Sequence, residues 1–400
     1  MDGTALGLVL QDIKLSLRLT DTQLGLMTGL AFAAFYAVVG VPLARWADRG
    51  NRVLIISLAA ALWSVMVALC SVAANFTQLL FIRMGVAVGE SGCIPPANSL
   101  LADYFERAER PRAAAIYMMG PSLSMLIGYG LAGWLNERFG WRTMFVLLGL
   151  PGLIPAAVAW LTLKEPRRVR WRAQAAVDGA RALEAAAAHP PASFLETVRI
   201  LWANATFRHL LSFFSIAYFF GCGILQWQPA FFMRSYHLSS GELGQWFALI
   251  YGLGGLLGTY GGGQWASRYA GGRESLQLKV AALTYAAFAL ISACVYLSPN
   301  RYVAFALMGL AAAGTAATLG PLFAAIQTLV PQQLRAVSIA IVYLSANLIG
   351  LGLGPLAAGA LSDALRPVLG EESLRYSLLI LCPGYVWGAW HLWRASRIVS

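Results

Sequence analysis

Charged residues are scarce in this sequence of 400 residues, where Asp, Glu, Lys and Arg make up only 12%. A soluble domain carries about 25% charged residues, because charged faces must cover its apolar interior. The deficit therefore excludes an ordinary water-soluble protein. Hydrophobic residues make up 58% of the chain, and the mean hydropathy is +0.64. A lipid bilayer accommodates this composition, because lipid tails solvate apolar helix faces.

Motifs for metals, nucleotides and catalytic nucleophiles are also missing. The cysteines stand singly, with no CxxC pair and no Cys/His cluster: Cys70, Cys93, Cys222, Cys294 and Cys382. No histidine has a second His, a Cys or a Ser at a useful spacing, so we expect structural roles for all four: His189, His209, His237 and His391. HExxH, GxSxG and GxxxxGK[ST] do not occur. We therefore predict no enzyme activity, no metal and no cofactor.

Long apolar runs recur along the chain and predict an all-α membrane protein. A spanning helix needs about 20 apolar residues. Eleven stretches meet that length: 22–47, 53–74, 77–101, 112–136, 142–163, 207–232, 241–266, 279–297, 302–329, 334–361 and 374–393. The apolar stretch 2–16 is shorter and ends at Lys14 and Arg18. We interpret it as the second half of a twelfth span, so we expect a first helix that is truncated in this chain.

Basic residues divide unequally between the two sets of loops. The loops that contain Arg49, Arg112 and Arg397 hold 20 Lys and Arg, whereas the opposite loops hold 8. The positive-inside rule places the richer set in the cytoplasm. It predicts a multi-pass protein of the inner membrane with a cytoplasmic C-terminus. The net charge of +11 then reflects topology and anionic lipids, so we do not expect nucleic acid as a partner.

One long polar segment lies near the middle of the chain. Residues 164–206 contain the basic run KEPRRVRWR, an alanine-rich stretch and a Pro-Pro pair. We interpret this segment as a cytoplasmic linker that lies near the membrane surface. It divides the chain into an N-terminal six-helix half, residues 1–163, and a C-terminal six-helix half, residues 207–400.

The two halves share short motifs. Three motifs recur: Leu19-Thr20-x-x-x-Leu24-Gly25 as Leu238-Ser239-x-x-x-Leu243-Gly244, Trp46-Ala47-Asp48-Arg49 as Trp265-Ala266-Ser267-Arg268, and Arg112-Ala113-x-Ala115-Ile116 as Arg335-Ala336-x-Ser338-Ile339. The first two pairs are offset by 219 residues and the third by 223. Two parallel repeats of six spans predict a substrate site between the halves, near the bilayer midplane. Rocking one half against the other then favours a transporter that works by alternating access.

Several segments resemble the major facilitator superfamily. Residues 43–52, LARWADRGNR, are similar to the loop between its second and third helices, and Arg83-x-Gly85-x-x-x-Gly89-Glu90 is similar to its fourth-helix arginine motif. Four further motifs resemble the Spinster-like branch: Gly140-Trp141-Arg142, Glu165-Pro166, Gly354-Pro355 and Ser362-Asp363. The resemblance implies a 12-helix fold of two six-helix halves and an amphipathic or lipid-like substrate, such as a lysophospholipid or a sphingoid lipid.

Arg83 and Glu90 are the charged residues that the fourth span contains. A charge inside a spanning helix costs roughly 2.5–3.5 kcal/mol on insertion scales and usually faces a cavity or a partner. Their spacing of seven residues is close to two helical turns, so both face one side of the helix, ~10 Å apart. Burial favours the protonated form of Glu90 and a nearby cation favours its charged form. We predict that Glu90 carries the coupled proton and that Arg83 binds substrate.

Asp2 is a second candidate for proton coupling. It lies ten to fourteen residues before the end of its helix, which places it at about the depth of Glu90, near the midplane. Spinster-like proteins tend to carry Asp-Arg in the middle of the first helix, whereas this chain has Asp2-Gly3. The acid is kept and the adjacent base is absent, so the role of that base does not carry over.

Other polar residues complete the predicted machinery. Tyr36, Trp227, Gln228 and Asn347 are predicted to contact substrate, although an aromatic stripe more often serves packing. A second set is predicted to latch the halves together at the cytoplasmic side when the transporter faces outward: Asp48, Arg49, Arg52 and Arg268.

Three functions are compatible with this sequence to different degrees. The leading prediction is a monomeric, proton-coupled secondary transporter of an amphipathic or lipid-like substrate, which uses the proton gradient as its energy source. The alternative is a transporter of the same fold for a small organic acid, a sugar or a drug. A distant alternative is a membrane scaffold or an intramembrane enzyme, which the missing motifs disfavour.

Overall fold

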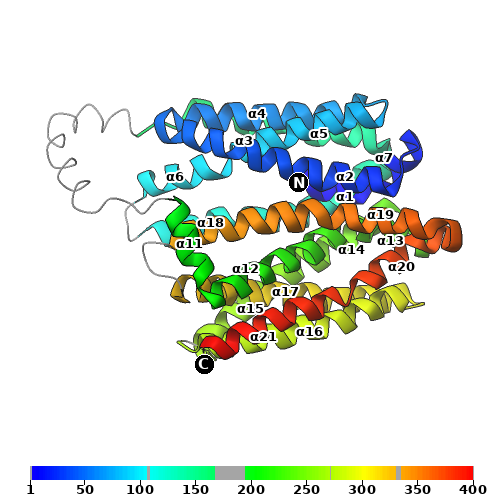
Figure 1. The fold of residues 1–400 in the computed structure, drawn as a ribbon. Helices are drawn as coiled ribbons and strands as arrows, with labels where there is room; N and C mark the ends of the chain where they lie inside the picture. Colours follow the sequence, from blue (N-terminus) through cyan, green and yellow to red (C-terminus); the bar gives the residue numbers. More distant parts are fainter. Residues whose placement is uncertain (1, 106–108, 167–193, 271, 330–334, 400) are drawn as a thin grey trace, which may run out of the picture.

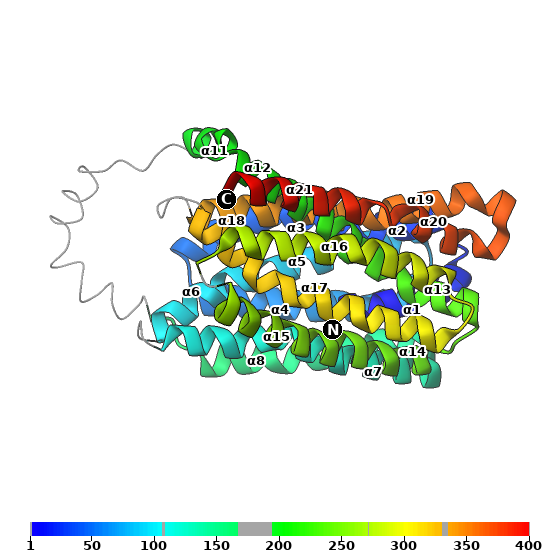
Figure 2. The same cartoon turned by 90° about the horizontal axis from the view of Figure 1, so that it is seen from below.

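The structure is a computed structural model that describes residues 2–105, 109–166, 194–270, 272–329 and 335–399. These residues form helices and short connections, with no β-strand among them, so the predicted all-α class is confirmed. The helices run side by side along one direction, with the N-terminal and C-terminal groups in two layers (Figure 1; Figure 2 gives the view turned by 90°).

The N-terminal group begins with a helix that is close to the predicted apolar stretch. Its helices are α1 (Asp2–Leu17), α2 (Asp21–Thr28), α3 (Leu30–Arg49), α4 (Arg52–Leu69), α5 (Phe76–Ser91), α6 (Ile94–Tyr104), α7 (Arg110–Gly149) and α8 (Leu153–Thr162). Gly140 has a φ of +76° and interrupts α7 between two predicted spans. A residue without a Cβ adopts this backbone conformation without strain, so the chain turns there and re-enters the bundle.

The C-terminal group follows the segment predicted as a linker, of which residues 167–193 lie outside the described part. Its helices are α11 (Phe194–Ala203), α12 (Ala205–Tyr218), α13 (Ile224–Tyr236), α14 (Ser240–Phe247), α15 (Gly254–Tyr269), α16 (Glu274–Leu297), α17 (Arg301–Leu329), α18 (Arg335–Ser345), α19 (Gly352–Leu369), α20 (Ser373–Leu381) and α21 (Gly384–Val399). Three π-helical segments join consecutive pieces: η3 (Phe219–Gly223), η4 (Ala248–Leu253) and η6 (Ala346–Leu351).

Most predicted spans are built from two helical pieces rather than one. The span predicted at 22–47 is α2 and α3, which meet at Gly29, and the span predicted at 241–266 is α14, η4 and α15. Seven continuous stretches of the described residues are long and apolar enough to cross a membrane. One of them, Ser338–Val399, has 62 residues, so at 1.5 Å per residue it is long enough for more than one crossing.

The helix bundle has two ends, the Thr20 end and the Arg52 end. The Thr20 end is where α1 finishes and α2 and α14 begin, and the Arg52 end is where α3 finishes and α4 begins. Thr20 caps α2 by accepting from the Gln23 backbone N–H, and Ser239 caps α14 by accepting from the Glu242 backbone N–H. The recurring Leu-Thr and Leu-Ser motifs therefore start equivalent helices in the two halves.

Candidate functional site

Arg83 lies on α5 and faces another helix of its own half. Its side chain is buried, and the guanidinium carbon lies 5.3 Å from the centroid of the Phe32 ring on α3. A cation over an aromatic face is attracted by the quadrupole of the ring. The apolar sequence of α5 therefore carries its one basic residue toward α3 rather than toward lipid.

Glu90 is the penultimate residue of α5, at the point where the fourth span breaks. A Cβ added at Gly89 would lie 2.6 Å from the Trp63 backbone nitrogen, so this glycine lets α5 pack directly on the backbone of α4. Glu90 itself is half-buried, and its charge acts on the Tyr36 hydroxyl of α3 and on the Cys93 thiol. The structure thus groups Tyr36 and Glu90, and Arg83 lies about two turns away on the same helix.

Asp2 is the first residue of α1, but its side chain lies outside the described part of the structure. Its predicted approach to Glu90 stays a prediction.

Gln228 belongs to a buried polar and aromatic cluster. Its Oε1 accepts a hydrogen bond from the Tyr251 hydroxyl in η4. The Tyr251 ring lies 6.1 Å from that of Tyr129, which is on α7 in the other half. Sequence reasoning missed both tyrosines, because an isolated Tyr in an apolar run carries no signal of a polar partner.

The two remaining predicted substrate residues differ in their surroundings. Trp227 is fully buried, and its indole N–H donates to the Pro355 carbonyl of α19 at 2.9 Å. In this conformation it packs α13 against α19. Asn347 is half-buried within the π-helical segment η6.

A charged cluster joins the two halves at the Thr20 end. The fully buried Asp21 of α2 accepts a bidentate pair from Arg234 of α13 at 2.7 and 2.8 Å, and Lys14 Nζ lies 2.6 Å from its Oδ1. The Ser362 hydroxyl of α19 donates to Asp21 Oδ2 at 2.7 Å. Three elements of two halves thus converge on one carboxylate, whose charge two cations compensate.

Asp363 adds a second contact between the halves at the same place. Its carboxylate accepts from the backbone N–H groups of Asp21 and Thr22, at 3.1 and 2.7 Å, and from the Thr22 hydroxyl at 2.6 Å. A carboxylate at a helix N-terminus satisfies unpaired N–H groups and favours the helix dipole. The Ser362-Asp363 motif of α19 therefore fixes the start of α2.

Close backbone contacts seal the same end. A Cβ added at Gly25 of α2 would lie 2.3 Å from the Pro355 carbonyl oxygen of α19. A Cβ added at Gly244 of α14 would lie 2.4 Å from the Tyr129 carbonyl oxygen of α7. Both glycines are needed because any larger residue would push the crossing helices apart. They are the paired glycines of the recurring motif, 219 residues apart.

Arg52, predicted as part of a latch between the halves, binds within its own half. Its guanidinium lies 2.5 Å from Glu165 and 2.7 Å from Asp103, and it donates to the Ser99 hydroxyl at 2.9 Å. The fully buried Arg52 therefore ties the start of α4 to α6 and to the segment after α8. The Glu165 of the Glu165-Pro166 motif supplies the counter-charge.

The other predicted latch residues lie at the same end of the bundle. Arg268 is exposed, with its guanidinium carbon 5.8 Å from the Tyr269 ring centroid. Asp48 and Arg49 lie in the last turn of α3, and their side chains are outside the described part. A latch in another conformation stays a prediction.

Two of the histidines, for which structural roles were predicted, are neighbours in the structure. His209 on α12 and His391 on α21 face each other, with their Nδ1 atoms 3.0 Å apart. They are separated by 182 residues, so no local spacing reveals them. The pair fastens α12 to α21, and the Trp390 ring lies 4.8 Å from that of His391.

The sequence and the fold find close parallels among known proteins. The family model of the Major Facilitator Superfamily matches residues 1–355. An MFS-type efflux pump of Mycolicibacterium smegmatis is 31% identical over 390 residues, which are 96% of this chain and 86% of that protein. The chain therefore belongs to the Major Facilitator Superfamily and is a membrane transporter rather than an enzyme.

Solved structures narrow the class further. A crystal structure of a bacterial homologue of the human lysosomal transporter Spinster, in an inward-facing and unoccupied conformation, has a TM-score of 0.82 and 29% identity. The match covers 99% of this chain and 93% of that one. The resemblance to the Spinster-like branch is thereby confirmed.

A probable L-galactonate transporter of Escherichia coli is 25% identical over 64% of this chain and 56% of its own length.

Proposed function

We propose that this chain is a proton-coupled secondary transporter that moves an amphipathic or lipid-like substrate by alternating access. The observation that carries the proposal is that one helix, α5, holds a buried Arg83 and, about two turns further on, Glu90 at the break of the span. Charges within an apolar helix are costly, and transporters place them at substrate and proton pathways.

The position of Glu90 suits a proton carrier. It lies in the last turn of α5, where the helix dipole is unfavourable to a negative charge. Tyr36 and Cys93 are among the neighbours on which its charge acts. Burial favours the protonated form of such a carboxyl group, and contact with water or with a cation favours its ionised form, so the group can bind and release a proton as the site closes and opens.

The surroundings of Arg83 suit an amphipathic substrate. The guanidinium offers a fixed positive charge for a phosphate or carboxylate head group. The Phe32 ring lies against that guanidinium, and Phe32 and Tyr36 are 6.1 Å apart between ring centroids. One cation beside apolar and aromatic side chains favours a lysophospholipid or a similar lipid over a fully polar solute.

The closed Thr20 end supports an inward-opening conformation in the transport cycle. The positive-inside rule assigns this end to the outer side, because the basic loops lie at the Arg52 end. The Asp21 cluster joins the halves there, which is the arrangement of a state that opens to the cytoplasm. A cytoplasmic C-terminus, an inner-membrane location and a monomeric state are part of the same proposal.

Substrate-driven proton movement tests the proposal. The full chain is reconstituted in liposomes that contain a trapped pH dye, and lysophosphatidylcholine or lysophosphatidylglycerol is added. We expect the lumenal pH to change with the parent protein and not with Glu90→Gln. Glu242→Gln is the matched control, because that glutamate is on α14 at the Thr20 end and pairs only loosely with Arg301, at 3.7 Å.

Each alternative result has a definite meaning. Proton movement that survives Glu90→Gln moves the proton site away from α5. Lipid movement without any pH change excludes proton coupling but agrees with a lipid-like substrate. Movement of a sugar acid such as L-galactonate, with no response to lysolipid, favours the alternative of a small organic acid, which the sequence similarity to the L-galactonate transporter supports.

A further inference from the structure

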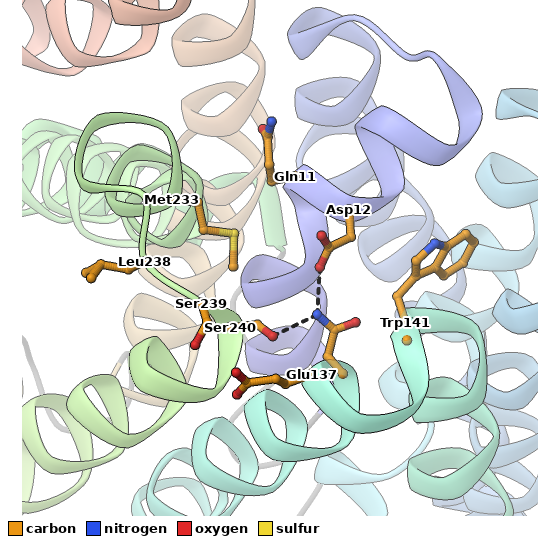
Figure 3. Close-up of a pocket in the computed structure, with 10 residues that line it drawn as sticks. Gln11, Asp12, Glu137, Trp141, Met233, Leu238, Ser239 and Ser240 are labelled. Carbon is orange, nitrogen blue, oxygen red and sulfur yellow. Dashed lines mark hydrogen bonds between the residues drawn. The ribbon is translucent and has the colours of Figure 1, made fainter.

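Two arginines of the C-terminal half lie close together at the Arg52 end. Arg208 is in the first turn of α12 and Arg394 is near the end of α21, and the charges of both act on His209. Figures 1 and 2 both show the end of α21 beside the start of α12. Neither arginine forms an ion pair with a described residue. At the Thr20 end the sign is reversed, because Asp12 and Glu137 line the pocket between the halves (Figure 3).

Most hydrogen-bond donors of these two guanidinium groups are unused within the described residues. Arg208 donates from Nη1 to the carbonyls of Trp202 and Ala203, at 2.5 and 3.3 Å, and so caps the end of α11. A guanidinium has five N–H donors, so its Nε and Nη2 groups remain. The guanidinium carbon of Arg394 lies 5.9 Å from the centroid of the Trp390 ring. Both arginines are exposed and therefore offer positive charge and N–H donors to a ligand outside the protein.

The histidine pair beside these arginines narrows the class of ligand. The imidazoles of His209 and His391 are side by side, and imidazole alone would suit a transition metal. Two neighbouring guanidinium groups disfavour a metal cation, and protonation of the pair would add further positive charge. The acid Glu274 of α16, which also packs against α21, lines a separate pocket with Arg273 and Lys279. The surroundings therefore favour an anion.

Exposed tryptophans lie around the two arginines and favour a lipid over a free anion. Trp387 and Trp390 of α21 are 59% and 49% exposed, and Trp202 at the end of α11 is 58% exposed. The His391 ring lies 6.0 Å from that of Trp387 and 4.8 Å from that of Trp390. Tryptophan is enriched where lipid tails meet head groups, because its ring is apolar and its N–H is polar.

The positions of the arginines along their helices fit the level of the lipid head groups. Arg208 is within the first turn of α12, and Arg394 is within the last two turns of α21. At 5.4 Å per turn, both lie within roughly 11 Å of a helix end, and arginine side chains extend further toward the interface. The positive-inside rule assigns this end to the cytoplasm, where the membrane leaflet carries anionic lipids.

We propose that Arg208 and Arg394 bind the phosphate head group of an anionic phospholipid whose acyl chains lie along the tryptophans of α21. The occupant is a lipid of the surrounding membrane and not a transported molecule. The proposal therefore does not depend on proton coupling or on a lipid-like substrate. Because Arg208 also holds the end of α11, the bound lipid joins α11, α12 and α21. It fastens the end of the segment between the halves to the C-terminal half.

Native mass spectrometry of the purified full chain, titrated with two-chain phosphatidylglycerol or phosphatidylcholine, tests the proposal. We expect one phosphatidylglycerol to bind about tenfold more tightly than phosphatidylcholine, the ratio that 1.4 kcal/mol of binding free energy produces. Arg208→Gln and Arg394→Gln should each lose this preference, whereas Arg394→Lys, which keeps the charge, should retain most of it. Arg273→Gln removes an exposed arginine at the same end but outside the site, and should bind like the parent.

Thermal unfolding checks that the variants fold and provides a second readout. Phosphatidylglycerol should raise the Tm of the parent and of Arg273→Gln, and should leave the Tm of Arg394→Gln unchanged, because a ligand of the folded state stabilises it. Three results would overturn the proposal. Equal affinity of the parent for the two lipids makes the surface a general lipid boundary. Unchanged phosphatidylglycerol affinity in both arginine-to-glutamine variants places the lipid elsewhere. Complete displacement of phosphatidylglycerol by inorganic phosphate makes the site one for a free anion.

Discussion

Two helix crossings close the Thr20 end, and they share a geometry while differing in chemistry. In one, α2 crosses α19 with Gly25 against Pro355, and in the other α14 crosses α7 with Gly244 against Tyr129. The glycines are 219 residues apart, as are the capping residues Thr20 and Ser239. The same repeat position that holds Asp21 in α2 holds Ser240 in α14.

That single difference separates a crossing held by buried charges from one held by neutral contacts. Asp21 binds Lys14 of its own half together with Arg234 and the Ser362 hydroxyl of the opposite half, so buried charges hold the α2–α19 crossing. Ser240 accepts a hydrogen bond from Asn136, donates a long one to the Gly133 carbonyl and lines a pocket between the halves. The two halves therefore keep equivalent backbone contacts. Charged side chains strengthen the α2–α19 crossing, whereas a pocket lies beside the α14–α7 crossing.

Among the substitutions at the two crossings, Asp21→Asn should lower the free energy of unfolding most. It leaves Lys14 and Arg234 buried without their counter-charge, which costs roughly 3–5 kcal/mol. Ser240→Ala removes two neutral hydrogen bonds, one from Asn136 and a long one to the Gly133 carbonyl, and should cost about 1–2 kcal/mol. The measurement is the free energy of unfolding in detergent, with Glu371→Gln in the exposed pair with Arg366 as a control. If Asp21→Asn and Ser240→Ala lowered the free energy of unfolding equally, the idea that α2–α19 is the stronger crossing would be falsified.

Substitution of the two crossing glycines should give intermediate and similar effects. Gly25→Ala and Gly244→Ala each place a Cβ within 2.4 Å of a backbone oxygen, so the helices must separate at a cost of about 1–3 kcal/mol. Gly255→Ala on α15 is the matched control, because nothing lies within 4 Å of its added Cβ. Thermal unfolding of the three variants decides the matter, and a loss for Gly255→Ala as large as the others contradicts the steric argument.

Removal of the two helix caps should have the smallest effect and the most symmetrical one. Thr20→Ala and Ser239→Ala each free one backbone N–H, of Gln23 or Glu242, and should destabilise by about 1 kcal/mol. Both variants are compared by chemical unfolding under the same conditions. A difference between them well above that value means that the caps do more than start their helices.

The class of fold could be predicted from the sequence because hydropathy and repeats are local signals. The spans, the two equivalent caps and the α5 charges Arg83 and Glu90 follow from short stretches of residues. The partners of charged residues could not be predicted in this way. Asp21 meets Arg234 across 213 residues, and Arg52 meets Glu165 across 113, so neither pairing exists before the helices pack.

Prediction also fails where helical regularity is interrupted. The Phe213-Phe214 and Phe231-Phe232 pairs are 18 residues apart, which is five turns of an ideal α-helix and predicts one common face. They belong to two separate hydrophobic clusters. Between them lies η3, and a π turn holds about one residue more than an α turn. One surplus residue turns the following helix by roughly 100°. The surplus residue of η3 therefore rotates α13 relative to α12, so the two helices of this span turn different faces toward their neighbours.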